Sequence, residues 1–126
     1  MFKANAVILY VNDLHQSIDY YSQLLDKEPA EKSPTFASMI LNDNVFLGLK
    51  SRHAVDPQID NEIAGAGELA FEVETHAEVD TIFQRWKSLQ VNMIQEPKMT
   101  SFAYTFVAVD LDGHRLRVFF PIKNFK

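Results

Sequence analysis

A chain of 126 residues with 47% hydrophobic and 23% charged residues has the size and composition of one globular domain. Its formal net charge is −5 and its basic residues are scattered, which excludes the basic surface that nucleic-acid-binding proteins present to phosphates. The absence of cysteine excludes disulfides, thiolate nucleophiles and zinc–thiolate sites.

The N-terminal segment and the hydropathy pattern favour a cytoplasmic protein. Residues 1–5 lead directly into a strand-like segment, without the charged start, apolar stretch and small-residue cleavage site of a secretory signal. No apolar run approaches the roughly 20 residues that span a bilayer. We therefore expect neither a membrane nor a nucleic acid as a partner.

A strand and a helix open the chain. Residues 6–11 are apolar and rich in β-branched and aromatic types, which indicates a strand. Asn12 and Asp13 offer a helix cap, with Gln16 placed to close a capping box. The apolar residues that follow at helical spacing are Leu14, Ile18, Tyr21 and Leu25.

A hairpin and a linker follow. Residues 36–41 and 45–49 are short apolar runs on either side of Asn42-Asp43-Asn44, and these turn residues tolerate left-handed conformations. Residues 51–67 contain proline, glycine, Asp and Asn without a sustained period. That composition predicts a linker over the surface.

The same order of signals returns in the second half. Residues 69–73 predict a strand, and Thr75 with Glu78 forms a capping box for a helix. The apolar face of this helix comprises Val79, Ile82, Phe83, Trp86 and Leu89. Residues 102–109 and 116–120 then predict a hairpin around an Asp112-Gly113 turn.

The two halves match at an offset of 62 residues, which aligns residues 6–11 with 68–73. We predict an α+β fold of two tandem β-α-β-β-β units, residues 4–50 and 67–121, in a single domain spanning 1–126. A ferredoxin-like or other two-layer α+β fold is the alternative from pattern alone.

Both ends of the chain carry a family resemblance. Leu9-Tyr10-Val11-Asn12-Asp13-Leu14, continuing through Ser17-Ile18-Asp19-Tyr20-Tyr21, resembles the opening strand and helix of the glyoxalase, bleomycin-resistance and dioxygenase (vicinal oxygen chelate) superfamily. Asp110-Leu111-Asp112-Gly113-His114 and the strand after it resemble the closing hairpin, with Leu111 in place of the usual proline. The resemblance implies units that form an open, glyoxalase-like cup, a short strand directly after each helix, and a homodimer.

Enzymes of this superfamily hold a divalent metal in the cup, with ligands from the first and last strands of each unit. The resemblance places these positions at Ala6 and Glu68 on the first strands, and at Phe46 (or Gly48) and Arg117 on the last strands. Only Glu68 is able to bind a metal, and a guanidinium repels one. We expect no metal and no cofactor.

Strand alternation places Glu68 and Arg117 together on the cup side, with Arg117 opposite Glu68. We predict an ion pair where the enzymes hold metal. In one interpretation the pair anchors a polar or anionic ligand. The other interpretation, a structural cross-strand pair, is the commoner use of such pairs on sheets.

Apolar and aromatic residues on strands that border the cup favour an amphipathic or planar ligand. They are Tyr10, Phe36, Met39, Phe46, Phe102, Tyr104, Phe106 and Phe119. His53, beside Arg52 in the linker, is a further candidate for a ligand contact or an acid/base group. The predicted ligand-binding residues are Glu68, Arg117, Tyr10, Phe46, Phe102, Tyr104, Phe119 and His53.

These patterns predict a metal-free protein that binds a small organic molecule without turning it over, as the bleomycin-resistance type does. One alternative is an enzyme, in which Glu68 acts with Arg117 or His53, or a metal site forms in a shifted register. Another alternative is a ligand-free scaffold domain, which a cavity collapsed by its own aromatic residues would favour.

Overall fold

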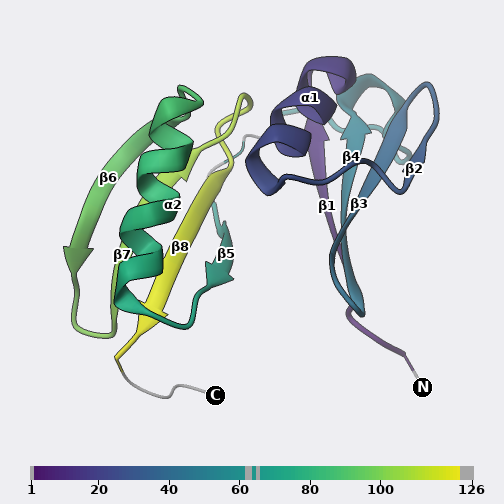
Figure 1. Cartoon of the computed structure of the whole chain (residues 1–126). Coiled ribbons are helices and arrows are strands. Elements are labelled where there is room, and N and C mark those ends of the chain that lie inside the picture. Colours follow the sequence, from purple (N-terminus) through teal and green to yellow (C-terminus); the bar gives the residue numbers. More distant parts are fainter. Residues whose placement is uncertain (1, 62–63, 65, 123–126) are drawn as a thin grey trace. The chain divides into compact units, whose positions relative to one another are not determined.

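A computed structural model describes residues 2–61, 64 and 66–122. The chain divides between residues 62 and 63 into two compact units. Each unit contains one four-stranded sheet, with strand order β1-β4-β3-β2 in the first and β5-β8-β7-β6 in the second (Figure 1). The strand order is the same in both, so the α+β fold of two tandem units is confirmed.

The first unit follows the predicted order of elements. Its elements are β1 (Ala6–Val11), α1 (Leu14–Leu25), β2 (Glu31–Lys32), β3 (Phe36–Asn42), β4 (Val45–Ser51) and a short 3-10 helix, η1 (Arg52–Ala54). Strand β1 pairs in parallel with β4, and β3 and β4 form the predicted antiparallel hairpin. The strand after the helix is only two residues long.

The second unit repeats this order. Its elements are β5 (Glu68–Glu72), α2 (His76–Ser88), β6 (Asn92–Met99), β7 (Ala103–Val109) and β8 (Arg115–Pro121). Strand β5 pairs in parallel with β8, and β8 pairs antiparallel with β7. Gly113 turns the β7–β8 connection at a φ of +92°, a conformation that costs glycine little because it has no Cβ.

Side-chain caps start both helices. The Asp13 carboxylate accepts from the Gln16 amide at 3.0 Å, and the Thr75 hydroxyl oxygen accepts from the Glu78 amide at 3.1 Å. The Glu78 carboxylate accepts in return from the Glu74 amide and the Thr75 hydroxyl. The two capping residues, Asp13 and Thr75, are those predicted from the sequence. Their side chains accept hydrogen bonds from backbone amides that the first turn of a helix leaves unpaired.

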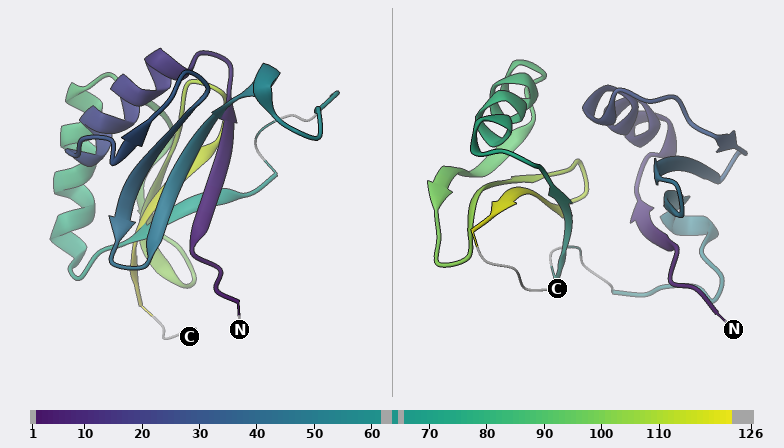
Figure 2. Two further views of the ribbon diagram at one scale, coloured as in Figure 1. Left: turned by 90° about the vertical axis from the view of Figure 1, so that its right-hand side faces the viewer. Right: turned by 60° about the horizontal axis from the view of Figure 1, so that its bottom comes forward.

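Each helix covers one face of its own sheet, which buries the apolar residues between them (Figures 1 and 2). In the first unit Tyr21 and Leu24 on α1, and Leu47 and Leu49 on β4, are all 3% exposed or less. In the second unit the Phe106 ring lies edge-on to the rings of both Phe83 and Trp86, with centroids 5.4 Å apart in each pair. The opposite face of each sheet carries no helix of its own unit, and we call it the helix-free face.

Candidate functional site

The helix-free face of the second unit carries a charged cluster around Arg117. Its Nε donates to Glu68 Oε1 at 2.6 Å and its Nη2 donates to Glu68 Oε2 at 3.3 Å. The side chains of Arg117 and Glu68 are 17% and 33% exposed. The predicted ion pair is therefore present, and it is bidentate, the geometry in which a guanidinium and a carboxylate interact most strongly.

The backbone register of this pair differs from the prediction. Glu68 lies opposite Arg115, and Arg117 lies opposite Ala70. The Arg117 side chain reaches Glu68 diagonally, because residues at alternate positions of a strand project from the same face. The prediction that Arg117 sits directly opposite Glu68 was wrong by two residues, although the two side chains do meet.

Thr105 is a third member of the cluster that sequence reasoning missed. It is fully buried on β7, and its Oγ1 accepts from Arg117 Nη1 at 3.2 Å while donating to the Val118 carbonyl at 2.7 Å. The guanidinium thus lies between Glu68 on β5 and Thr105 on β7. A threonine within an otherwise apolar strand was the available signal, because a buried hydroxyl needs a partner.

The equivalent positions in the first unit hold no donor. Ile8 pairs with Gly48 in the first unit, just as Ala70 pairs with Arg117 in the second. Gly48 is therefore the position that corresponds to Arg117. The prediction that named Phe46 first for this position was wrong, and its alternative, Gly48, was right. A Cβ on Gly48 would lie 2.9 Å from two ring carbons of Phe36 and 3.2 Å from Ile8. The Phe36 ring therefore occupies the space that a side chain at position 48 would need.

The predicted aromatic residues of the first unit separate between the two faces of its sheet. Met39 is fully buried and packs in the core under α1, so its predicted place on the cup lining was wrong. Tyr10, Phe36 and Phe46 alternate with the residues that pack under α1, and like Gly48 they lie on the helix-free face. All three are partly exposed.

The second unit places only one of its predicted aromatic residues beside the charged cluster. Phe119, 8% exposed, lies two residues beyond Arg117 on β8 and projects from the same face. Phe106 lies on the other face, in the core with Phe83 and Trp86. Its predicted place at the cup was wrong.

Tyr104 also lies on the helix side of its sheet, which contradicts the expectation that it faces the cup. Its ring stacks on His76 with centroids 3.6 Å apart, and its hydroxyl donates to Asp80 Oδ1 at 2.6 Å. Both partners belong to the first two turns of α2. The hydrogen bond to Asp80 raises the pKa of Tyr104 above its ordinary value of 10.0, with smaller contributions from burial and from the Asp80 charge.

Phe102 and His53 lie at the ends of elements. Phe102, 42% exposed, is in the turn between β6 and β7, and its carbonyl accepts from the Ile122 amide at 2.9 Å. His53 is exposed within η1 of the first unit. Ligand contacts by these two residues stay predictions.

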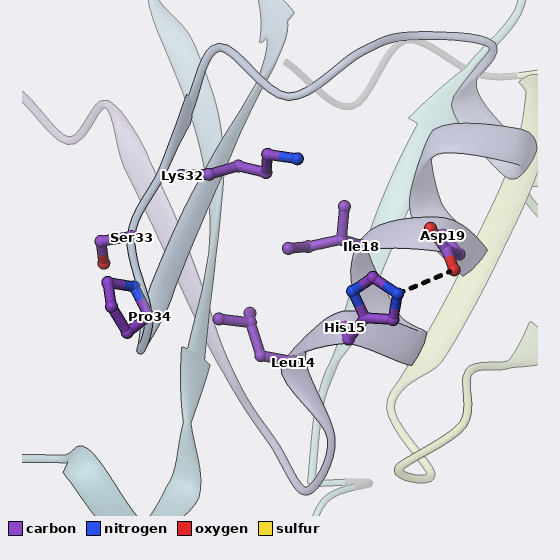
Figure 3. A pocket seen from close by; sticks show the side chains of 7 residues that line it. All are labelled: Leu14, His15, Ile18, Asp19, Lys32, Ser33 and Pro34. Carbon is purple, nitrogen blue, oxygen red and sulfur yellow. Dashed lines mark ion pairs between the residues drawn. The ribbon is translucent and has the colours of Figure 1, made fainter.

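A separate hollow of about 350 Å³ lies in the first unit, between α1 and the segment that joins β2 to β3 (Figure 3). Leu14 and Ile18 point into it from the helix, facing Lys32 and Pro34. On its rim, His15 and Asp19 approach to 3.9 Å, but their side chains are 89% and 65% exposed. The polar residues that line this hollow, His15, Asp19, Lys32 and Ser33, are exposed, so it has no buried polar group of the kind that orients a ligand.

Within the described residues, no three His, Cys, Asp or Glu side chains gather closely enough to hold a metal ion. Among the same residues, no helix is long and apolar enough to cross a membrane.

Comparison with known proteins decides the family. The model of the Glyoxalase/Bleomycin resistance protein/Dioxygenase superfamily matches residues 3–118. The chain belongs to this superfamily. Among curated proteins, the chain is 30% identical over 117 residues to the phenazine antibiotic resistance protein EhpR of Enterobacter agglomerans, and the match covers 90% of this chain and 88% of EhpR.

Solved structures of superfamily-like proteins share the fold. The solution NMR structure of protein ATC0852 from Agrobacterium tumefaciens is 44% identical, covers 98% of this chain and 100% of its own, and has a TM-score of 0.86. A glyoxalase-related enzyme from Fulvimarina pelagi has a TM-score of 0.84 with 17% identity, covering 95% and 88% of the two chains. At that identity the likeness shows the fold alone.

Proposed function

We propose that this superfamily member binds a planar aromatic molecule of the phenazine class and sequesters it unchanged, without a metal. One observation carries the proposal. Of the four positions from which the superfamily's enzymes recruit metal ligands, Ala6 and Gly48 offer no donor, and Glu68 and Arg117 neutralise each other. The relationship to a phenazine antibiotic resistance protein supports the ligand class.

The donor set does not fit a metal. A catalytic zinc needs about three protein ligands, and harder divalent cations need more oxygen donors. Glu68 alone supplies a carboxylate, and both of its oxygens already accept from Arg117. A cation at this place would also meet a guanidinium that stays charged at every physiological pH.

The second unit offers apolar groups for an aromatic ring beside the ion pair. Ala70 and Val107 flank Arg117 on the neighbouring strands. Phe119 projects from the same face two residues further along β8. Apolar side chains beside an aromatic ring suit a flat, apolar ligand, because both partners leave water on binding.

Binding can be measured by isothermal titration calorimetry with phenazine-1-carboxylate, followed by mass spectrometry of the recovered ligand. We expect one molecule per chain, recovered unchanged, and several-fold weaker binding in Phe119→Leu, because Phe119 lies beside the Arg117 cluster and an aromatic contact contributes about 1 kcal/mol beyond its buried area. Phe2→Leu is the matched control, since Phe2 is 90% exposed, and it should bind like the wild type. A new product in the recovered ligand would favour an enzyme.

A separate measurement tests the proposal that the protein works without a metal. Protein purified without chelator or metal affinity resin is analysed by inductively coupled plasma mass spectrometry, as wild type and as Glu68→Ala. We expect metal far below one equivalent in both proteins. Stoichiometric metal that is lost in Glu68→Ala would overturn the proposal and favour a metalloenzyme.

We also propose that the protein is a homodimer. Strand β1 is at the edge of its sheet, contains no charged residue or proline, and exposes 37% of Val7 and 51% of Ile8. Unprotected apolar edges of this kind tend to pair with another chain. Light scattering after size-exclusion chromatography should give twice the mass of 14.4 kDa, and a monomer at micromolar concentration would contradict the proposal.

A further inference from the structure

The guanidinium of Arg117 is held by Glu68 and Thr105, and its side chain is 17% exposed. A guanidinium has five N–H donors. Three of them are used here: the Nε N–H and one Nη2 N–H donate to Glu68, and one Nη1 N–H donates to Thr105. The described residues supply no acceptor for the remaining N–H on each terminal nitrogen. Arg117 therefore keeps hydrogen-bonding capacity for a ligand.

The orientation of this guanidinium is fixed before any ligand arrives. Glu68 binds it through both carboxylate oxygens. The Thr105 hydroxyl donates its hydrogen bond to the Val118 carbonyl, so its oxygen lone pairs are available to accept from Arg117 Nη1. A donor pair that is already oriented loses little conformational freedom on binding.

The charges around Arg117 balance. Arg115 on β8 and Glu72 on β5 project from the same face as Arg117 and Glu68. These four side chains together carry no net charge, so preference for a carboxylate rests on the fixed donors of Arg117 and not on a surplus of positive charge.

The surface beside Arg117 suits a flat ring. Its neighbours on the adjacent strands are Ala70 on β5 and Val107 on β7, and both are apolar and small. Phe119 follows about 7 Å further along β8, at about 3.3 Å per residue. A ring that lies on these apolar side chains can direct a substituent at its edge to the guanidinium.

We propose that Arg117 binds the carboxylate of an aromatic acid through its two remaining N–H groups, so that the protein selects aromatic carboxylates over the corresponding amides and unsubstituted rings. The planar fork of a guanidinium matches the two oxygens of a carboxylate, whereas an amide offers one oxygen and no charge. The inference rests on the proposed function, because it names the class of ligand that the same protein takes.

The test compares phenazine-1-carboxylate, phenazine-1-carboxamide and phenazine by calorimetry on the wild type, Arg117→Lys and Thr105→Val. In the wild type the carboxylate should bind at least tenfold more tightly than the carboxamide. Arg117→Lys keeps the charge but loses the fork, so the preference should fall to about twofold. Arg85→Lys makes the same substitution on an exposed residue of α2 and should leave the preference unchanged.

Thr105→Val keeps the shape of the side chain and leaves Arg117 in place, so it tests the inference even when an Arg117 variant fails to fold. It should lower the preference about threefold, because Nη1 loses the acceptor that orients it. Equal binding of the carboxylate and the carboxamide by the wild type would overturn the inference and leave the proposed function intact. Failure of all three probes to bind would overturn the proposed function itself.

Discussion

Breaking the Glu68–Arg117 pair should destabilise the second unit by about 1–2 kcal/mol. Two charges about 4 Å apart attract by about 1 kcal/mol in water and about 4 kcal/mol at the effective dielectric constant of a protein surface. The side chains are 33% and 17% exposed, so the attraction falls between these limits. The cost of removing both ions from water offsets part of this attraction, which leaves a net contribution of about 1–2 kcal/mol.

A double-mutant cycle isolates this interaction. Glu68→Gln, Arg117→Gln and the double variant are unfolded with urea at about pH 6, and we expect a coupling free energy of about 1 kcal/mol. The control cycle uses His15→Gln and Asp19→Asn, whose side chains are 3.9 Å apart and 89% and 65% exposed. It should give a coupling near zero. Equal couplings in the two cycles would refute the reasoning that partial burial strengthens the Glu68–Arg117 pair.

Three further substitutions test other parts of the structure. Tyr104→Phe should lower stability by about 1 kcal/mol at pH 7 through loss of the Asp80 hydrogen bond. That bond raises the Tyr104 pKa above 10.0 in the folded state. The stability difference between wild type and Tyr104→Phe should therefore be full below pH 10 and vanish as pH rises through the raised pKa. Urea unfolding from about pH 7 to pH 11 measures this difference, and a difference that stays constant with pH would contradict the prediction. Gly48→Ala should cost no more than about 1 kcal/mol, because the new Cβ meets the far end of the partly exposed Phe36 ring at 2.9 Å and the ring can move aside. Phe36→Leu in the same chain should recover the lost thermal stability, and a larger loss that Phe36→Leu does not recover would contradict the contact. Thr75→Ala should cost about 1 kcal/mol and speed hydrogen exchange in the first turn of α2, and unchanged exchange there would show that the hydroxyl does not cap the helix.

The sequence predicted most elements because their signals are local. The predicted first strand and the observed β1 have the same bounds, Ala6–Val11, and both helices begin after the cap residues that the sequence indicated. The strands that follow the helices carry weaker signals. Strand β2 has only two residues, both charged, and β6 contains Pro97 and two shifts in its register with β7, which interrupt the alternation that reveals a strand.

The site was only partly predictable, because it depends on pairing between strands that are distant in sequence. Alternation within β5 and β8 placed Glu68 and Arg117 on one face, but nothing local fixes the register of a parallel pair, and the prediction missed it by two residues. Strand β7 gives no useful alternation, because Ala103, Thr105, Phe106, Val107 and Ala108 are all buried. Sequence reasoning therefore could not tell that Tyr104 faces the helix and Thr105 faces Arg117.

The helix-free faces of the two units differ in polarity, and Gly48 explains the apolar character of the first one. Position 48 lacks a donor because glycine has no side chain, and for the same reason the Phe36 ring is able to lie over the strand. The missing ligand and the apolar surface therefore have one cause. At the matching position of the second unit, Arg117 extends across β8 and fixes charge and hydrogen-bond donors on the sheet. Substitutions at position 117 should therefore change carboxylate selection, whereas Gly48→Ala, in the other unit, should leave that selection unchanged.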